Sequence, residues 1–164
     1  MKKHTPQTRQ IIYCDTGVYR TTWCGPYAIA VICGTEYEQA YRTVRAIRGK
    51  RHCKGITCDN LTKASAKLGV KGKWVDLEKR QKFGNFMKTL EKNKVYVINV
   101  TKHFLILDTR DYTTIDNQVP KWIAGEMSKH KSKLVSKYFV VENPKFEPKQ
   151  NNECKSCRAC WDPS

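Results

Sequence analysis

Apolar positions in the first half of the chain recur at helical spacing, whereas those in the second half fall into short continuous runs bounded by polar turns. The segment 24–33 is apolar on all sides, with Pro26 in its first turn and Gly34 directly after it. Proline suits the first turn of a helix and glycine suits its end, so this segment predicts a central, buried helix.

Two further helices are predicted downstream. Thr35 and Glu38 have the spacing of a capping box, and the helix that they open is expected to end at Gly49. A shorter third helix is expected over about 58–68, where Gly69 stops it. Less regular patterns predict a strand, an amphipathic helix and a short helix, in that order, at 73–77, 82–92 and 120–127.

The second half is predicted to form a sheet of short strands. β-Branched and aromatic residues dominate four runs, which lie at 95–100, 103–107, 112–116 and 138–143. The first three follow one another across short turns and predict an antiparallel meander. Helices first and antiparallel strands afterwards indicate an α+β domain, in which N-terminal helices pack on a small antiparallel sheet.

With 164 residues, the chain has the size of one domain. After residue 143 it becomes rich in Pro, Lys and Asn, so we expect a domain at 1–143 and an irregular, basic, cysteine-rich tail at 144–164. No apolar run approaches the roughly 18 residues of a membrane span, and the basic N-terminus leads into no apolar stretch of signal-peptide length. We therefore expect a cytoplasmic protein without a membrane partner.

The net charge of +16 arises from 31 Lys and Arg against 15 Asp and Glu. A field of this sign favours polyanions, so non-specific nucleic acid and acidic proteins are candidate partners. Basic residues cluster at 42–54 and 129–137, and the alternative is that each cluster is simply a solvated face. No zinc-finger, winged-helix or stacking-aromatic motif accompanies them, which argues against sequence-specific reading of nucleic acid.

Eight cysteines are many for a chain without a secretory signal, since disulfides belong mainly to secreted proteins. They are therefore interpreted as free thiols, metal ligands or a nucleophile. Cys24 differs from the others because a thiol in the first turn of a helix lies at the positive end of the macrodipole, which stabilises the thiolate. Gly25 beside it leaves room for a substrate. The alternative is that Cys24 is one more buried apolar residue.

His103, at the start of an apolar run, is the candidate general base for Cys24. An imidazole that titrates near neutral pH can take the proton of a thiol. Asp116, at the end of the neighbouring predicted strand, is the candidate for holding the second ring nitrogen, with Asn117 as the alternative. Taken alone, His103 would suit a hydrogen-bonded structural histidine better than a base.

The segment WCGPYAIAVICG, in which an aromatic residue precedes a Cys-Gly pair, resembles the nucleophile helix of papain-like cysteine peptidases. KHFLIL and, after a turn, YTTIDN are similar to that superfamily's histidine strand and third catalytic member. The order Cys, His, Asp resembles its compact bacterial members, such as bacteriocin-leader peptidases that cut after double glycine. The phrase CGTEYEQAYR resembles small phage-encoded peptidase-like proteins. The resemblance covers about residues 15–117.

This resemblance implies a papain-like fold and a cysteine hydrolase that acts on an amide bond of a peptide or protein substrate, with no cofactor required for catalysis. It implies that Cys24 attacks the carbonyl, that His103 moves the proton and that Asp116 orients His103. The backbone N–H of Cys24 would hold part of the oxyanion.

The chain departs from the family at Val18, where the family's pattern has an oxyanion-stabilising glutamine. Alternative donors are Tyr19, Thr21 and Thr22, and also Gln10 if a loop brings it near. Loss of one such donor costs ~10²–10³ in rate. The alternative function is therefore a catalytically inactive papain-like scaffold that binds nucleic acid or a protein partner, such as a phage structural or accessory protein in the host cytoplasm or the virion.

The tail contains a CxxCxxC motif, formed by Cys154, Cys157 and Cys160. Thiolates at this spacing can chelate zinc, and a structural zinc site needs four ligands. Cys53 is the candidate for the fourth, with Cys58 and His52 as alternatives. The other interpretation is a redox-sensitive tail without a metal.

Overall fold

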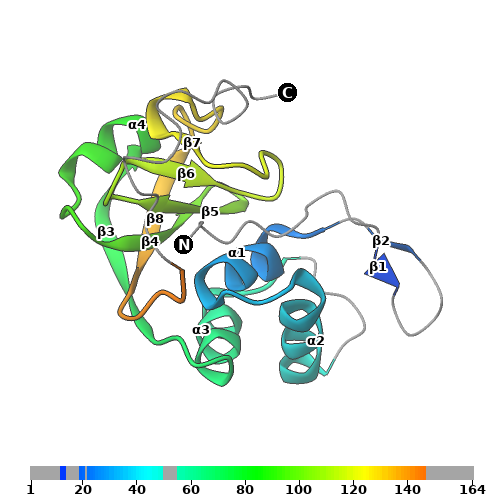
Figure 1. Cartoon of the computed structure of the whole chain (residues 1–164). Coiled ribbons are helices and arrows are strands. Elements are labelled where there is room, and N and C mark those ends of the chain that lie inside the picture. Colours follow the sequence, from blue (N-terminus) through cyan, green and yellow to red (C-terminus); the bar gives the residue numbers. More distant parts are fainter. Residues whose placement is uncertain (1–11, 14–18, 21, 50–54, 147–164) are drawn as a thin grey trace.

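The three longer helices of the described chain, which lie within residues 24–67, gather on one side of the molecule (Figure 1). The computed structural model describes residues 12–13, 19–20, 22–49 and 55–146. Within these ranges the helices are α1 (Cys24–Cys33), α2 (Tyr37–Arg48), α3 (Cys58–Lys67) and the short α4 (Phe83–Phe86). Short 3-10 turns lie at Met87–Thr89 and Gly125–Met127. No helix in this part of the chain is long and apolar enough to cross a membrane.

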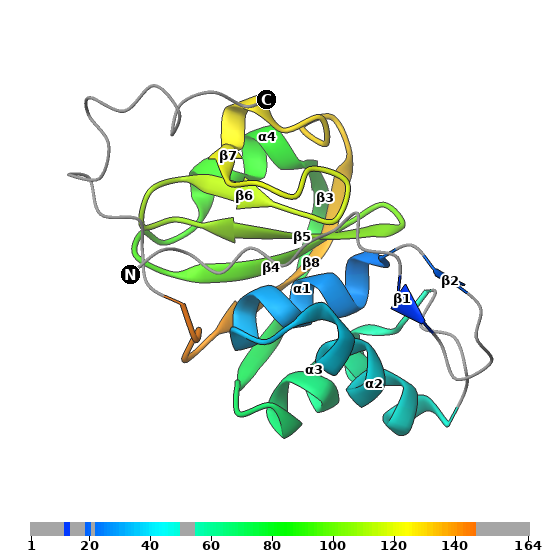
Figure 2. The ribbon, with the colours of Figure 1, turned by 45° about the vertical axis from the view of Figure 1, so that its right-hand side comes forward.

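The strands form a small hairpin and one six-stranded sheet. The hairpin pairs β1 (Ile12–Tyr13) with β2 (Tyr19–Arg20). The strands of the sheet are β3 (Gly72–Lys82), β4 (Val95–Val100), β5 (His103–Asp108), β6 (Thr113–Ile115), β7 (Ile123–Ala124) and β8 (Leu134–Val141). They are antiparallel in the order β3-β8-β4-β5-β6-β7, and helices α1 to α3 lie together beside the sheet (Figure 2). The predicted α+β class and the β4-β5-β6 meander are confirmed.

Helix α1 begins at Cys24 and ends at Cys33, as predicted. Gly34 closes it with a φ of 63°, in the left-handed region that favours glycine, and donates its N–H to the carbonyl of Val31. The helix contacts β5, α2 and α3, so every residue after the first is buried. Only its N-terminal end reaches the surface of the molecule.

Two contacts fix the start of α1. The backbone N–H of Trp23 donates a hydrogen bond of 2.8 Å to the hydroxyl of Tyr37, which ties the helix start to α2. A Cβ atom at Gly25 would collide with the side chain of Ile56, so the glycine allows the segment before α3 to pack directly on the first turn. These contacts determine where Cys24 lies.

His103 is the first residue of β5, directly after a tight turn in which Lys102 has a φ of 57°. Strand β5 pairs with β6 in the register Ile106 to Ile115. Continued by one residue, this register places Asp116 opposite Leu105. His103 lies two residues before Leu105, and residues two apart on a strand share a face, so Asp116 and His103 lie on the same face of the sheet.

Apolar side chains cover both faces of the sheet. One core lies between the sheet and helices α1 to α3 and includes Tyr27, Ile106 and Phe139. The other contains residues of the opposite parity on β5, such as Leu105, together with Phe83 of α4. Buried on both sides, β5 is a rigid support for the histidine at its start.

The start of α2 differs from the prediction. Its N-cap is Glu36, no side-chain hydrogen bond caps it, and the hydroxyl of Thr35 is buried without a partner in the described part of the chain. The predicted capping box of Thr35 and Glu38 is therefore wrong, although the helix itself, which ends before Gly49, is confirmed.

Several elements differ in length from the prediction, among them the strand predicted at 138–143, which begins four residues earlier and spans Leu134–Val141. The strand predicted at 73–77 continues to Lys82 at the edge of the sheet, where its charged side chains stay in solvent. Its pairing with β8 is interrupted after Asp76 and resumes at Gln81 and Lys82. The helices predicted at 82–92 and 120–127 are reduced to α4 with one 3-10 turn and to a single 3-10 turn. In the latter segment, sheet hydrogen bonds from β7 to β6 replace helical ones.

Candidate active site

Cys24 is the first residue of α1 and is partly exposed. Burial raises the pKa of its thiol, but the contact with His103 and the backbone N–H groups of Phe104 and Gly25 lower it more strongly. The pKa of Cys24 therefore lies below that of an ordinary cysteine. The positive end of the helix dipole acts in the same direction.

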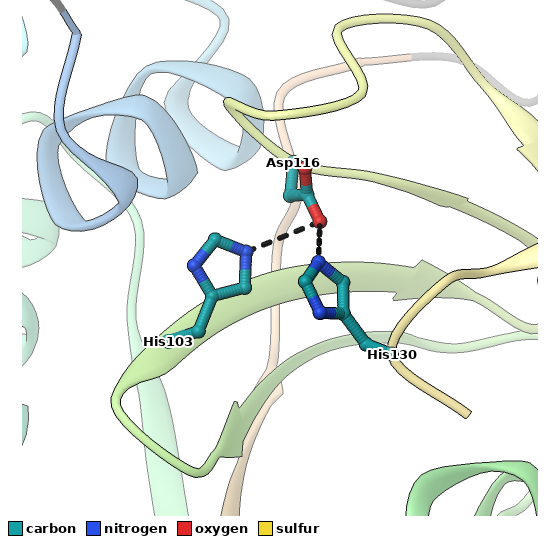
Figure 3. Close-up of side chains that lie close together, drawn as sticks. All are labelled: His103, Asp116 and His130. Carbon is teal, nitrogen blue, oxygen red and sulfur yellow. Dashed lines mark ion pairs between the residues drawn. The ribbon is translucent and has the colours of Figure 1, made fainter. Parts of the chain in front are cut away.

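His103 is buried at the start of β5. Its Nε2 atom lies 3.1 Å from Oδ2 of Asp116, which leaves Nδ1 as the nitrogen for Cys24 (Figure 3). Burial lowers the pKa of the imidazole, whereas the contacts with Asp116 and Cys24 raise it above the ordinary value for histidine. The opposite shifts of Cys24 and His103 both favour a thiolate–imidazolium pair.

Asp116 follows β6 and presents its two carboxylate oxygens to different partners. Oδ1 accepts hydrogen bonds from the backbone N–H groups of Gln118 and Val119, at 2.8 and 2.7 Å. Oδ2 faces His103. Burial raises the pKa of the carboxyl group, but the contact with His103 and the N–H of Val119 outweigh burial and lower it. Asp116 is therefore a carboxylate at neutral pH.

The structure thus brings together the three residues that the sequence nominated. They come from the start of α1, the start of β5 and the end of β6. The alternative to Asp116, Asn117, makes a different contact, because its Nδ2 donates to the backbone oxygen of Thr22 at 3.2 Å.

A second histidine, which sequence reasoning missed, belongs to the same cluster. Nε2 of His130 lies 2.8 Å from Oδ2 of Asp116, and its ring centroid lies 4.6 Å from that of His103 (Figure 3). His130 is only 2% exposed. It stands in a lysine-rich segment before β8, where no periodicity or spacing marks it, so residue type was the only available signal.

Cys24 and His103 line a cleft of about 680 Å³, a volume typical of ligand sites. Trp23, Ile56 and Phe104 provide much of its apolar surface. Besides His103, the positively charged residues of its described lining are Lys102 and Lys137, and no carboxylate from the described ranges lines it. Asp116 lies behind His103, outside this lining.

Cys58, the first residue of α3, lines the same cleft but differs electrostatically from Cys24. Burial raises the pKa of its thiol above the ordinary value. The amide of Asn99 donates to its sulfur at 3.6 Å, and no imidazole contributes to its pKa. Two cysteines of one cleft are therefore expected to differ in reactivity.

The donors proposed for the oxyanion are only partly described. Gln10, Val18 and Thr21 lie outside the described residues, and the backbone of Tyr19 belongs to β2. Thr22 is buried and lines the cleft beside Cys24. Among these candidates, Thr22 is the one that the described ranges bring to the site.

The predicted zinc ligands Cys53, Cys154, Cys157 and Cys160 lie outside the described residues, as does His52, so zinc binding there stays a prediction. A different donor set is formed by His103, Asp116 and His130, whose ligand atoms lie within 4.8 Å of one another. Zinc ligands at 2.0–2.2 Å from a tetrahedral ion would be about 3.3 Å apart. The shorter separations of 3.1 and 2.8 Å favour direct contact of Asp116 with the two rings.

Comparison with known proteins finds similarity of fold to two solved structures. No family model matches the chain, and no curated protein matches it in sequence. The chain is similar in fold to a double glycine motif protease from an AMS/PCAT transporter in complex with the leader peptide, at 13% identity and a TM-score of 0.48, over 83% of this chain and 93% of that one. It is also similar to the peptidase domain of Streptococcus ComA, a bifunctional ABC transporter involved in quorum sensing, at 17% identity and a TM-score of 0.49, over 85% and 99%.

Proposed function

We propose that the protein is a cysteine peptidase in which Cys24 is the nucleophile, His103 the proton carrier and Asp116 the group that orients His103. One observation carries the proposal: a cysteine of lowered pKa at a helix start contacts a histidine of raised pKa, at the wall of an open cleft. A nucleophile, its base and an orienting carboxylate in this order are the parts that thiol-based acyl transfer needs.

The proposed reaction has two halves. The Cys24 thiolate attacks the carbonyl carbon of the scissile amide, the C–N bond breaks, and His103 gives its proton to the leaving amine, which leaves a thioester on Cys24. Water then attacks the thioester while His103 takes a proton from it, the C–S bond breaks, and release of the carboxylic acid restores the thiolate–imidazolium pair. Asp116 keeps Nε2 of His103 engaged throughout, so that Nδ1 faces Cys24.

The oxyanion would be held by the backbone N–H of Cys24, at the positive end of α1. The side chain of Val18 cannot donate a hydrogen bond. Since one missing oxyanion donor costs ~10²–10³ in rate, we expect slow turnover unless Thr22 supplies the second donor.

The proposed substrate is a peptide or a protein segment that enters the cleft in an extended form. The apolar surface of Trp23, Ile56 and Phe104 suits apolar side chains of such a segment. Lys102 and Lys137 line the cleft, and no carboxylate belongs to its described lining, so the two lysines favour neutral or acidic residues over basic ones. The exposed Asp76, whose Oδ1 lies 3.9 Å from Nζ of Lys137, offsets part of this attraction.

The test is alkylation of individual cysteines, followed by mass spectrometry, across a pH series. Cys24 is expected to react with iodoacetamide well below the pH at which ordinary thiols react, whereas Cys58, in the same cleft, is expected to react only at higher pH. Cys24→Ala should abolish cleavage of a peptide library, while Cys58→Ala should retain it. If Cys24 reacts no faster than an unfolded thiol, the proposed function is wrong.

The alternative, an inactive scaffold that binds nucleic acid or an acidic protein, is favoured by the net charge of +16 and by Val18. It predicts no cleavage by the wild-type protein, together with retention on heparin that persists in ~0.5 M salt. A protein held on heparin by diffuse charge alone would elute at a lower salt concentration.

A further inference from the structure

We infer that His130 is a positioning residue of this site, which directs its Nε2 at Asp116 and packs on His103, so that one carboxylate oxygen faces two imidazoles. The catalytic consequence rests on the proposed function. The geometric assignment does not, because it concerns which groups hold Asp116 and His103 in place.

The first support is the approach of two imidazole side chains to a single carboxylate oxygen. Oδ2 of Asp116 lies 2.8 Å from Nε2 of His130 and 3.1 Å from Nε2 of His103, so His130 is the nearer of the two (Figure 3). The two rings are also in contact, with centroids 4.6 Å apart and planes inclined by 34°. His130 therefore restricts both the carboxylate and the ring that the carboxylate orients.

The second support is the way in which Asp116 is fixed at its other oxygen. Oδ1 accepts two backbone N–H groups, those of Gln118 and Val119. The carboxylate cannot rotate about its axis without losing these bonds, so Oδ2 stays directed at the histidines. Its remaining acceptor capacity is divided between His103 and His130.

The third support concerns the proton on His130. Its Nδ1 is buried and has no hydrogen-bond partner in the described ranges. Burial and the charges of His103 and Lys133 lower the pKa of His130 despite Asp116, so the ring is neutral at physiological pH and carries one N–H. That proton belongs on Nε2, which faces the carboxylate. Neither ring's N–H points squarely at Oδ2, so the contacts hold Asp116 mainly by electrostatic attraction.

The fourth support is the anchoring of His130 by its own backbone. Its N–H donates to the hydroxyl of Ser128 at 3.1 Å, and its carbonyl accepts the N–H of Lys133 at 3.0 Å. The segment leads directly into β8, which lies between β3 and β4 in the sheet. His130 is thus a fixed point that holds Asp116 from outside the β5–β6 pair.

The experiment compares His130→Gln with His130→Leu. Glutamine can bring an N–H close to the position of Nε2, whereas leucine fills the buried space without a donor. We expect His130→Leu to lower kcat about tenfold or more, the scale on which outer groups that orient a functional side chain act, with KM within about twofold. It should also move the pH midpoint of Cys24 alkylation upward. His130→Gln should restore much of both properties, and the melting temperatures of the two variants should be similar.

Several results would overturn the inference. Wild-type kcat and an unchanged alkylation profile in His130→Leu would make His130 a packing residue, and so would losses that follow the melting temperature and are not recovered by His130→Gln. Wild-type activity that disappears in a chelator would assign the cluster to a metal ion instead. The alkylation profile can be measured without turnover. If the wild-type protein cleaves no peptide, but His130→Leu still moves the alkylation midpoint of Cys24 upward, the proposed function is refuted and the positioning role of His130 is supported.

Discussion

At the scale of single residues, burial and neighbouring groups act against each other on every member of the site. Burial raises the pKa values of Cys24 and Asp116 and lowers that of His103, so by itself it would remove all three charges. In each case the contact with the next member reverses the shift. The charges therefore depend on one another, and removing one should return the others toward the state that burial favours.

Asp116→Asn tests this dependence. The carboxylate raises the pKa of His103, so its loss should let burial lower that pKa, and the alkaline limb of the pH profile of kcat/KM should move to lower pH. Since Cys24 then has a less charged neighbour, its pKa should rise and the acidic limb should move to higher pH. The active window narrows from both sides, and kcat falls by up to about 10⁴, the cost of this replacement in a Ser-His-Asp triad.

The matched control is Asp111→Asn, which removes a carboxylate from the turn between β5 and β6. Asp111 accepts a hydrogen bond of 2.6 Å from the hydroxyl of Thr113 and is not part of the site. Its replacement should leave both limbs of the profile in place. A window as wide in Asp116→Asn as in Asp111→Asn would contradict the assigned role of Asp116.

The residues that the sequence nominated share one property, which His130 lacks. Cys24, His103 and Asp116 each stand at the end of an element that the local pattern predicts. His130 stands in a polar segment and reaches Asp116 only because β8 returns to the middle of the sheet. That pairing depends on contacts far apart in the sequence, which no local pattern encodes.

At the scale of elements, the same distinction separates correct from incorrect predictions. Helix α1 and the β4-β5-β6 meander follow from local periodicity and turn residues, and they occur where predicted. The second half of β3 carries a run of charges, and no strand is predicted for it beyond residue 77. It is a strand because β8 offers its free edge, and pairing that resumes at Gln81 and Lys82 satisfies the backbone there whatever the side chains are.

Gly25→Ala tests how closely α1 is packed at its catalytic end. Within a helix this change usually stabilises by about 0.5–1 kcal/mol. Here the new Cβ would collide with Ile56, which is 7% exposed and cannot move freely, so we expect a loss of about 1–3 kcal/mol in the free energy of unfolding.

Ile56→Ala separates the collision from other effects of the glycine replacement. Alone it should destabilise by about 2–5 kcal/mol, but in combination with Gly25→Ala the costs should not add, because the colliding atoms are gone. Gly84→Ala is the control, since its Cβ would meet Lys131 at an ordinary 3.5 Å. Additive effects of the two replacements in urea unfolding would show that the start of α1 is loosely packed.

At the scale of the whole molecule, the charge of +16 surrounds a cleft whose described lining has lysines and no carboxylate. The field of the entire surface attracts any anionic substrate, and salt weakens it within a Debye length of about 8 Å at physiological ionic strength. The lysines at the cleft act only on residues bound near them. Diffuse and local attraction therefore predict different responses to the same loss of charge.

The double replacement Lys102→Asn and Lys137→Gln removes two charges from the cleft, and Asn suits the left-handed backbone at residue 102. Lys88→Gln with Lys92→Gln removes the same net charge from exposed positions that do not line it. On matched peptides with Glu or Lys near the scissile bond, the cleft variant should lose about two- to fivefold of the preference for Glu in kcat/KM, whereas the distant variant should keep it. Added salt should weaken the preference of the wild-type protein and bring it toward that of the cleft variant. Equal losses in the two variants would mean that the overall field, rather than Lys102 and Lys137, selects the substrate.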